Sequence, residues 1–269
     1  MKYLIISLVC LVLGIAGCTA NNQQWQTISF NVESGDADPE TIANTYIAPL
    51  QNIDIWGFSE VQNGRWAQIL EAAAEKGENA DFGGILGTTG GEDRLMIAYN
   101  RDRFQKIRHF ELKNINLGGR VRAPLVAHFR FQATGDEFLF MVNHLYRSDR
   151  QRRHQQAQML NQWAQKQDLP IVAVGDYNFD WDVNSNGDHR DRGFDYLTQN
   201  GVFSWVQPRK LLPTNCHPKY QSILDFIFIS QPVKTWSPSA KILYPQASYC
   251  PDDEQKSDHR PVRGTFKLP

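Results

Sequence analysis

The chain has 269 residues, of which 41% are hydrophobic, and its 28 basic residues nearly balance its 29 acidic residues, for a formal net charge of −1. This length is sufficient for one large domain with a substantial core. A near-neutral chain has no global basic field to capture nucleic acid, so nucleic-acid binding would depend on a local basic cluster.

The N-terminus predicts export. Lys2 is followed by an apolar segment over residues 4–16, which has the length of a signal-peptide core and is short for a membrane-spanning helix. The segment runs into Cys18 in a pattern that resembles a bacterial lipobox. We therefore expect residues 1–17 to be a lipoprotein signal peptide, Cys18 to carry the lipid and residues 18–24 to form a polar tether. An ordinary secretory signal or an uncleaved anchor is the alternative. A lipid on Cys18 would hold the chain on a membrane of the bacterial cell envelope, facing the periplasm or the outer surface.

Residues 25–269 are expected to form one domain in which strands outnumber helices. Short runs rich in β-branched and aromatic residues predict eight strands. They cover residues 25–32, 53–61, 95–99, 121–131, 138–145, 171–175, 223–230 and 262–266. Helical patterns cover residues 38–50, 64–76 and 149–167. Many strands with few helices favour an α/β (α+β) sandwich of mixed sheets with helices outside, in which polar residues at strand ends converge on one rim.

The strand over residues 171–175 leads into the strongest local signal. Asp176 and Asn178 follow it two residues apart, so both side chains can face the same side and hold a metal, a water or a phosphate oxygen. The alternative is a simple turn, because Asx side chains bond to nearby backbone groups.

Other polar side chains also lie beside apolar strands. Asn31 and Glu60 close the first two strands, and a carboxylate among apolar residues is costly unless it is paired or binds a cation. His144 closes a later strand, where a structural role is the alternative. Asp258 and His259 come just before the last strand. Oxygen ligands combined with imidazoles favour a divalent metal that acts on a phosphate ester.

Cys216 and Cys250 are the two cysteines that remain after the signal segment and Cys18. An even number in an oxidising compartment predicts one disulfide, and two free thiols are the alternative. The disulfide would brace the segment that leads to Asp258.

Taken together and in order, these motifs resemble the endonuclease/exonuclease/phosphatase superfamily, which includes deoxyribonuclease I. The resemblance rests on Asn31, Glu60, Asn143-His144-Leu145, Gly175-Asp176-Tyr177-Asn178, Leu224-Asp225-Phe226 and Ser257-Asp258-His259. It covers about residues 25–268 and implies a four-layered α/β sandwich of two packed mixed β-sheets with outer helices. It also implies a divalent-metal-dependent phosphodiesterase, and we favour a nuclease of the endonuclease type.

The resemblance implies roles on the metal side of the site. Glu60 would bind Mg²⁺ or Mn²⁺, with Asn31 and Asp258 close by. His259 would act on the attacking water as its base or electrostatic partner, and Asp225 would fix the orientation of this imidazole.

It also implies roles on the substrate side. Asp176 and Asn178 would position the water and the phosphate. His144 would stabilise or protonate the departing oxygen, with Asp93 as its orienting carboxylate. Arg122 would contact a phosphate, a task that suits a permanently charged, fork-shaped donor.

The substrate is less constrained by the sequence. Gln62 stands where sequences similar to deoxyribonuclease I tend to carry an arginine. The resemblance therefore does not extend to the contact that this arginine makes with the minor groove of DNA. The basic residues over 147–154 could contact a DNA or RNA backbone, or form a solvated helical face. A phosphatase or sphingomyelinase-type hydrolase of small phosphate esters or lipid head groups stays open, as does a surface-attached binding protein without catalysis. We expect a monomer.

The loop over residues 180–188 resembles the start of a calcium loop. Asp182, Asn184, Asn186 and Asp188 place oxygen atoms at alternate positions, as a secondary Ca²⁺ site requires. Gly193 stands where a calcium loop has its glutamate, and a polar surface loop is the alternative.

Overall fold

The structure is a computed structural model that describes residues 23–250 and 255–268. The predicted signal peptide, Cys18 and all but the end of the predicted tether lie outside these residues. Within the described part of the chain, no helix has the length and hydropathy needed to cross a membrane.

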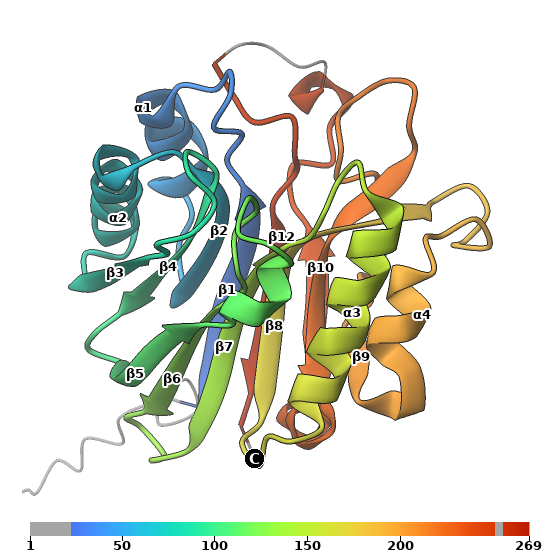
Figure 1. Ribbon diagram of the computed structural model, residues 1–269. Coiled ribbons are helices and arrows are strands. Elements are labelled where there is room, and N and C mark those ends of the chain that lie inside the picture. Colours follow the sequence, from blue (N-terminus) through green and yellow to red (C-terminus); the bar gives the residue numbers. More distant parts are fainter. Residues whose placement is uncertain (1–22, 251–254, 269) are drawn as a thin grey trace, which may run out of the picture.

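Two six-stranded mixed sheets form the centre of the molecule (Figure 1). The first sheet contains β1 (Gln24–Asn31), β2 (Ile55–Val61), β3 (Phe82–Leu86), β4 (Arg94–Asn100), β11 (Ser239–Ile242) and β12 (Val262–Lys267). Its order is β11-β12-β1-β2-β4-β3, with β1 and β2 parallel. The second contains β5 (Phe104–Glu111), β6 (Leu125–Phe131), β7 (Glu137–His144), β8 (Ile171–Asp182), β9 (Phe203–Trp205) and β10 (Ser222–Ser230). Its order is β5-β6-β7-β8-β10-β9, with β7 and β8 parallel.

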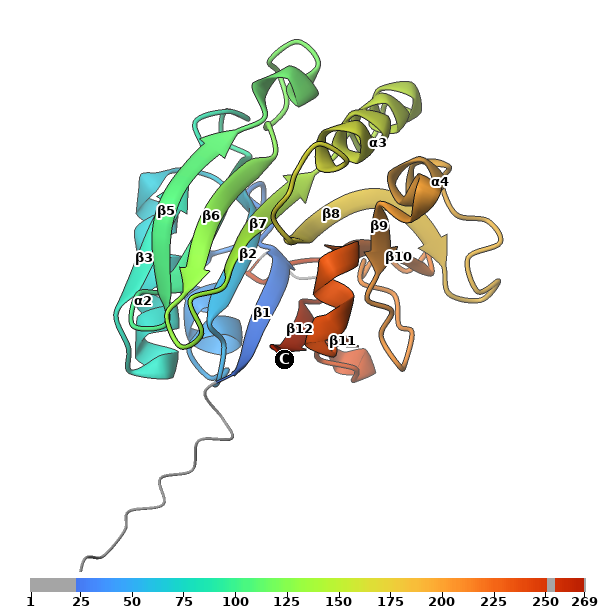
Figure 2. The ribbon, with the colours of Figure 1, turned by 90° about the horizontal axis from the view of Figure 1, so that it is seen from below.

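Helices cover the outer faces of both sheets. The first sheet carries α1 (Pro39–Ile42), a π-helical turn over Ala43–Ile47, and α2 (Gly64–Glu78), whereas the second carries α3 (Arg150–Ala164) and α4 (Gly193–Thr198). Short 3-10 turns lie at Lys113–Asn116, Gln199–Gly201, Gln231–Trp236 and Ala247–Tyr249. Figure 2, seen from below, shows the two sheets face to face. The predicted four-layered sandwich is confirmed.

The two sheets approach closely at their centre because Gly57 of β2 has no side chain. A Cβ atom at this position would lie 2.4 Å from Val174 and 2.9 Å from Val142 of the second sheet. Both valines are fully buried in the apolar layer between the sheets. A larger residue would push the sheets apart and displace the strand ends that carry the site.

Several predicted boundaries were wrong for local reasons. The strand expected from residue 121 begins at Leu125, directly after Pro124, which has no N–H for a ladder. The strand expected to end at Gly175 continues to Asp182. The helix expected over residues 149–167 is Arg150–Ala164, and the side chain of Asp149 caps it by accepting from the Arg152 N–H at 3.0 Å.

Candidate active site

A cavity of about 320 Å³ opens at the end of the sandwich where β1, β2 and β7 finish. Six of the residues predicted for the site line it: Glu60, His144, Asp176, Asn178, Asp258 and His259. Side chains from opposite ends of the sequence therefore meet in one polar cavity.

Glu60 is turned into this cavity by an irregularity in β2. The pairing of β2 with β4 shifts register between Phe58 and Val61, and Glu60 adopts a left-handed φ of 63°. A bulge of this kind re-aims a side chain next to a functional site, and a non-glycine residue at positive φ costs free energy. The local backbone is thus distorted at the residue that the sequence predicted as a metal ligand.

Asn31 holds the carboxylates of the site in place. Its Nδ2 donates to Glu60 Oε1 at 2.8 Å and to Asp176 Oδ2 at 3.2 Å, and its Oδ1 accepts from the Glu33 N–H at 3.0 Å. The amide oxygen is therefore used by the backbone, while the amide nitrogen orients two acidic groups. A direct bond from Asn31 to a metal stays a prediction.

Gly175 permits the close contact between β7 and β8 that positions the next residue. It has a φ of 140°, and a Cβ atom there would lie 1.9 Å from the backbone oxygen of Asn143. Asp176 then points into the cavity, where its Oδ1 accepts from the Asn178 N–H at 2.9 Å. Asp176 and Asn178 both line the cavity, as predicted, and they also form the Asx turn of the alternative interpretation.

The Oδ2 atom of Asp176 lies between the two imidazoles of the site. It is 3.5 Å from His144 Nε2 and 3.9 Å from His259 Nε2. The carboxylate thus separates two histidines, and Glu60 Oε1 approaches His144 Nε2 from another direction at 3.8 Å.

His259 is fixed by a buried carboxylate. Its Nδ1 donates to Asp225 Oδ2 at 2.7 Å, which leaves Nε2 facing the cavity with Asp258 Oδ1 at 3.6 Å and Asn215 Nδ2 at 3.5 Å. Burial disfavours the imidazolium, but the charges of Asp225, Asp176 and Asp258 outweigh this effect and place the pKa of His259 well above its ordinary value. The site therefore stabilises positive charge on this ring.

His144 has a looser partner. Its Nδ1 lies 3.5 Å from Asp93 Oδ1, beyond normal hydrogen-bond length, and neither atom has another hydrogen-bond partner in the described structure. Burial raises the pKa of Asp93, but His144 and Arg122 more than offset this and hold it below its usual value. Asp93 is therefore an anion beside His144, as the sequence predicted.

Arg122 lies behind this pair. It donates to Asp93 through Nη1 and to the backbone oxygen of His144 through Nε at 3.0 Å. Its side chain is 9% exposed and does not line the cavity of the described structure. In this arrangement Arg122 orients Asp93 and His144, and its predicted contact with phosphate stays a prediction.

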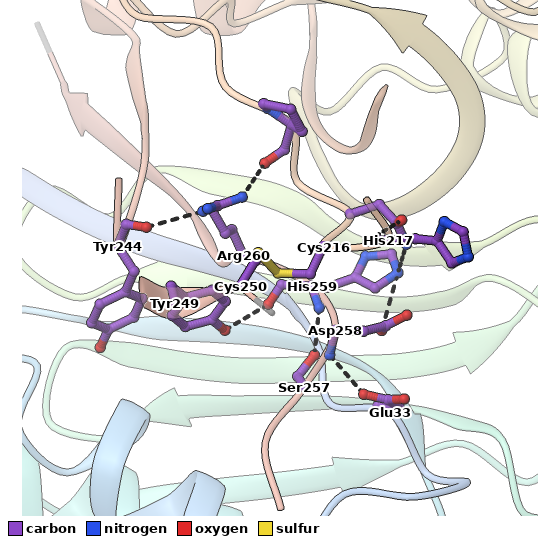
Figure 3. Close-up of a disulfide and its surroundings, with 12 residues drawn as sticks. Glu33, Cys216, His217, Tyr244, Tyr249, Cys250, Ser257, Asp258, His259 and Arg260 are labelled. Atoms are coloured by element: carbon purple, nitrogen blue, oxygen red, sulfur yellow. Dashed lines mark hydrogen bonds and ion pairs between the residues drawn. A yellow bond between two sulfur atoms is a disulfide. The ribbon is translucent and has the colours of Figure 1, made fainter. Parts of the chain in front are cut away.

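The predicted disulfide between Cys216 and Cys250 is confirmed, with a Cα–Cα distance of 5.2 Å (Figure 3). The Cys216 N–H donates to the backbone oxygen of Asp258 at 2.7 Å. Next to Cys250, the Tyr249 hydroxyl donates to the backbone oxygen of His259 at 2.7 Å. The disulfide therefore joins two segments that hold the Asp258–His259 backbone.

Three further residues support the site, and they were not predicted as site residues from the sequence. Ser257 Oγ donates to the Asn31 backbone oxygen at 2.6 Å and accepts from the His259 N–H at 3.0 Å. Glu33 lines the cavity and accepts from the Asp258 N–H at 2.6 Å, while Asn215 contacts His259. Ser257 and Asn215 are sequence neighbours of predicted residues, and this adjacency was the available signal.

The donor set of the cavity fits a divalent ion. The described chain has two groups of three residues whose possible ligand atoms lie within 4.8 Å of one another. The first group is Glu60, Asp93 and His144, and the second is Asp176, Asp225 and His259. The carboxylates of Glu60, Asp176 and Asp258 line one cavity, and such a concentration of negative charge is costly without a cation. Carboxylate oxygens suit Mg²⁺ or Mn²⁺.

The loop predicted to bind calcium lies outside both groups. Asp182 Oδ1 accepts from the Asn184 N–H at 2.8 Å, and the Asp182 backbone oxygen accepts from the Gly187 N–H at 2.8 Å. These bonds belong to a turn, so the calcium site stays a prediction.

The sandwich and its cavity of histidines and carboxylates define a class of metal-dependent phosphoesterases. The model of the Endonuclease/Exonuclease/phosphatase family matches residues 28–259, so the chain belongs to this family. Its members are hydrolases that act on phosphoesters. A comparison with curated protein sequences gave no match.

Solved structures share the fold at low sequence identity. An endonuclease/exonuclease/phosphatase family protein from Bacteroides thetaiotaomicron is 18% identical, with a TM-score of 0.67, over 91% of this chain and 95% of that chain. D. rerio TDP2 complexed with single strand DNA product is 16% identical, with a TM-score of 0.70, over 91% and 99% of the two chains. A mannosyl-6-phosphatase from Bacteroides thetaiotaomicron is 18% identical, with a TM-score of 0.63, over 89% and 98%.

Proposed function

We propose that the chain is a divalent-metal-dependent phosphodiesterase of the nuclease type. The observation that carries the proposal is the pair of histidines on either side of Asp176, each with a second carboxylate at its Nδ1 atom. One imidazole can act on the attacking water and the other on the departing oxygen, as in-line hydrolysis of a phosphodiester requires.

The residues divide this chemistry between them. His259, held by Asp225, presents Nε2 to the water, and His144 presents Nε2 to the leaving oxygen. Asn178 can hold a phosphate oxygen from the same cavity wall. Mg²⁺ or Mn²⁺ bound by Glu60 with Asp258 would neutralise phosphate charge and polarise the phosphoryl oxygen. Calcium at residues 182–188 is not required by this proposal.

An exposed aromatic pair at the cavity supports a nucleic-acid substrate. Tyr220 is 49% exposed, its ring centroid lies 5.0 Å from that of His217, and both residues line the cavity. Flat, accessible rings beside a phosphate site can stack on unpaired bases. The structural neighbour TDP2 has been seen with a single strand DNA product, which is consistent with this proposal.

A direct comparison of substrates tests the nuclease assignment. Purified enzyme with Mg²⁺ or Mn²⁺ is given bis-p-nitrophenyl phosphate, single-stranded DNA, RNA, supercoiled plasmid, sphingomyelin, inositol phosphates and a sugar phosphate. We expect cleavage of bis-p-nitrophenyl phosphate and of at least one nucleic acid. Cleavage of sphingomyelin or of monoesters alone would replace the nuclease proposal with the sphingomyelinase or phosphatase alternative. No cleavage of any substrate would favour a binding protein.

We also propose that the chain is an exported monomer that a lipid on Cys18 anchors to the cell envelope. The lipobox-like sequence and the disulfide between Cys216 and Cys250 support export, because disulfides persist in oxidising compartments. Radiolabelled palmitate should be incorporated into the wild-type chain and not into Cys18→Ser. Labelling that is equal in both would contradict the anchor.

A further inference from the structure

A second cavity of about 240 Å³ adjoins the candidate active site and is rich in arginine. The two cavities share Arg153 and Asp180 as wall residues. Arg150, His154, Arg190, Asp191 and Arg192 also line the second cavity. These residues come from the start of α3 and from the segment between β8 and α4, which lie side by side (Figure 1).

Asp191 organises the cavity. Its carboxylate lies 2.8 Å from Arg153 Nη2, 3.1 Å from His154 Nε2 and 3.7 Å from Arg150 Nε. It also accepts from the Gly193 N–H at 2.8 Å, which ties α3 to the start of α4. Asp191 faces two guanidinium groups and an imidazole, and Asp180 is the other carboxylate of the wall, so the four arginines of the cavity outnumber its two acidic residues.

Other arginines keep the cavity positive at its mouth. Arg192 is exposed, and no ion pair connects it to a carboxylate of the described chain. The side chain of Arg150 is 78% exposed, although it approaches Asp191. The Nε atom of Arg153 is buried and has no hydrogen-bond partner within the described structure. Arg190, in contrast, pairs with Asp195 at 2.7 Å.

The basic sequence around α3 therefore has two parts. Arg152 bonds to the Tyr146 hydroxyl at 2.8 Å and approaches Asp149, as expected for a solvated helical face. Arg150 and Arg153 instead line the basic cavity. The solvated-face interpretation therefore describes Arg152, and contact of Arg150 and Arg153 with a nucleic-acid backbone stays a prediction.

Building on the proposed nuclease function, we propose that this basic cavity binds a second phosphate group of a single-stranded polynucleotide, next to the phosphate that is cleaved. Guanidinium groups with unused donors match phosphate oxygens, and the shared wall at Arg153 places the two cavities side by side. The exposed rings of Tyr220 and His217 at the first cavity favour a ligand that carries unpaired bases over a small polyphosphate.

Binding of an oligonucleotide tests this subsite without cleavage. Fluorescein-labelled oligothymidylate is titrated with His259→Ala protein in Mg²⁺, and the dissociation constant is measured by anisotropy at several salt concentrations. Adding Arg150→Gln and Arg192→Gln should raise the dissociation constant about tenfold. In a plot of log Kd against the logarithm of the salt concentration, the slope should fall by about 0.7 for each phosphate that the double variant no longer neutralises. Lys106→Gln combined with Arg108→Gln is the matched control, because it also removes two charges and both residues are exposed on β5 outside both cavities.

The possible outcomes separate the subsite from the proposed activity. An equal dissociation constant and salt slope in the double variant and the control would overturn the subsite, even for an active nuclease. Arg-dependent binding by a protein that cleaves no phosphodiester would contradict the nuclease proposal and support the subsite. Displacement of the oligonucleotide by inositol hexakisphosphate, but not by unlabelled oligothymidylate, would overturn the polynucleotide assignment.

Discussion

The two histidines of the candidate active site are held by partners of very different rigidity. His259 and Asp225 are both buried and lie 2.7 Å apart, with a disulfide beside the segment that carries His259. His144 and Asp93 lie 3.5 Å apart, and the Asp93 side chain is 33% exposed. The half of the site formed by His259 and Asp225 is therefore rigid, as its proposed action on the attacking water requires. The half formed by His144 and Asp93 has room to adjust to the leaving group of the proposed reaction.

The largest expected effect belongs to the rigid half. Replacing His259 with Gln removes the imidazole that we propose acts on the attacking water, so kcat should fall about 10³-fold, within the range for loss of a positioned acid–base group. Hydrolysis of bis-p-nitrophenyl phosphate measures the loss, and a melting curve like that of wild type shows that the fold is kept. A loss of less than tenfold would remove His259 from the mechanism.

The looser half should respond less. Asp93→Asn keeps the size of the side chain but removes the charge next to His144, and we expect kcat to fall about tenfold. Asp225→Asn is the matched variant at His259. It should lower kcat by about 10²-fold or more, because it disturbs a hydrogen bond that is already formed. Equal losses in the two variants would contradict the difference between the two halves.

Removing the disulfide beside His259 should lower the stability of the fold more than it lowers activity. The bond between Cys216 and Cys250 closes a segment of sequence separation 34, so the double Ser variant should lose about 2–4 kcal/mol of unfolding free energy. Urea unfolding monitored by fluorescence measures this loss. Activity should fall only a few-fold at low temperature, because the Tyr249–His259 and Ser257–His259 hydrogen bonds remain. Unchanged stability would show that these bonds alone hold the segment.

A buried carboxylate that does not line the cavity should change stability with pH without changing catalysis. Burial raises the pKa of Asp54 to about 6, although Arg103 lies 2.5 Å away and lowers it. The folded state therefore favours neutral Asp54. Between pH 4 and about 6, Asp54 loses its proton readily in the unfolded chain but not in the folded one. The unfolding free energy should therefore fall by roughly 2–3 kcal/mol as the pH rises through this range. Asp54→Asn should flatten this slope while leaving kcat unchanged. If the unfolding free energy of Asp54→Asn still fell over this pH range, other groups would be responsible for the pH dependence.

The central strands were predictable from sequence, and the edges of the sheets were not. The four missed strands, β3, β5, β9 and β11, are the outermost strands of the two sheets. Two glycines weaken β3, β9 and β11 are short, and most of β5 is exposed. Edge strands are selected for such features, which remove the apolar alternation on which prediction depends.

The site was predictable where its residues end apolar strands or match the family motif. Glu60 and Asp176 were found in this way, and both line the cavity. Asp191 was missed because its role depends on contacts with Arg153 and His154 that form only when α3 packs beside α4. Tertiary contacts of this kind leave no periodic signal along the chain.

The most direct test of the account is metal-dependent hydrolysis of bis-p-nitrophenyl phosphate by wild type and by Glu60→Gln. Wild-type activity should disappear in EDTA and return when Mg²⁺ or Mn²⁺ is added in excess. Glu60→Gln should need much more metal and lose at least about 10²-fold in kcat, because a charged ligand is gone. Wild-type activity that survives EDTA, or full activity of Glu60→Gln at the same metal concentration, would contradict a metal site at Glu60.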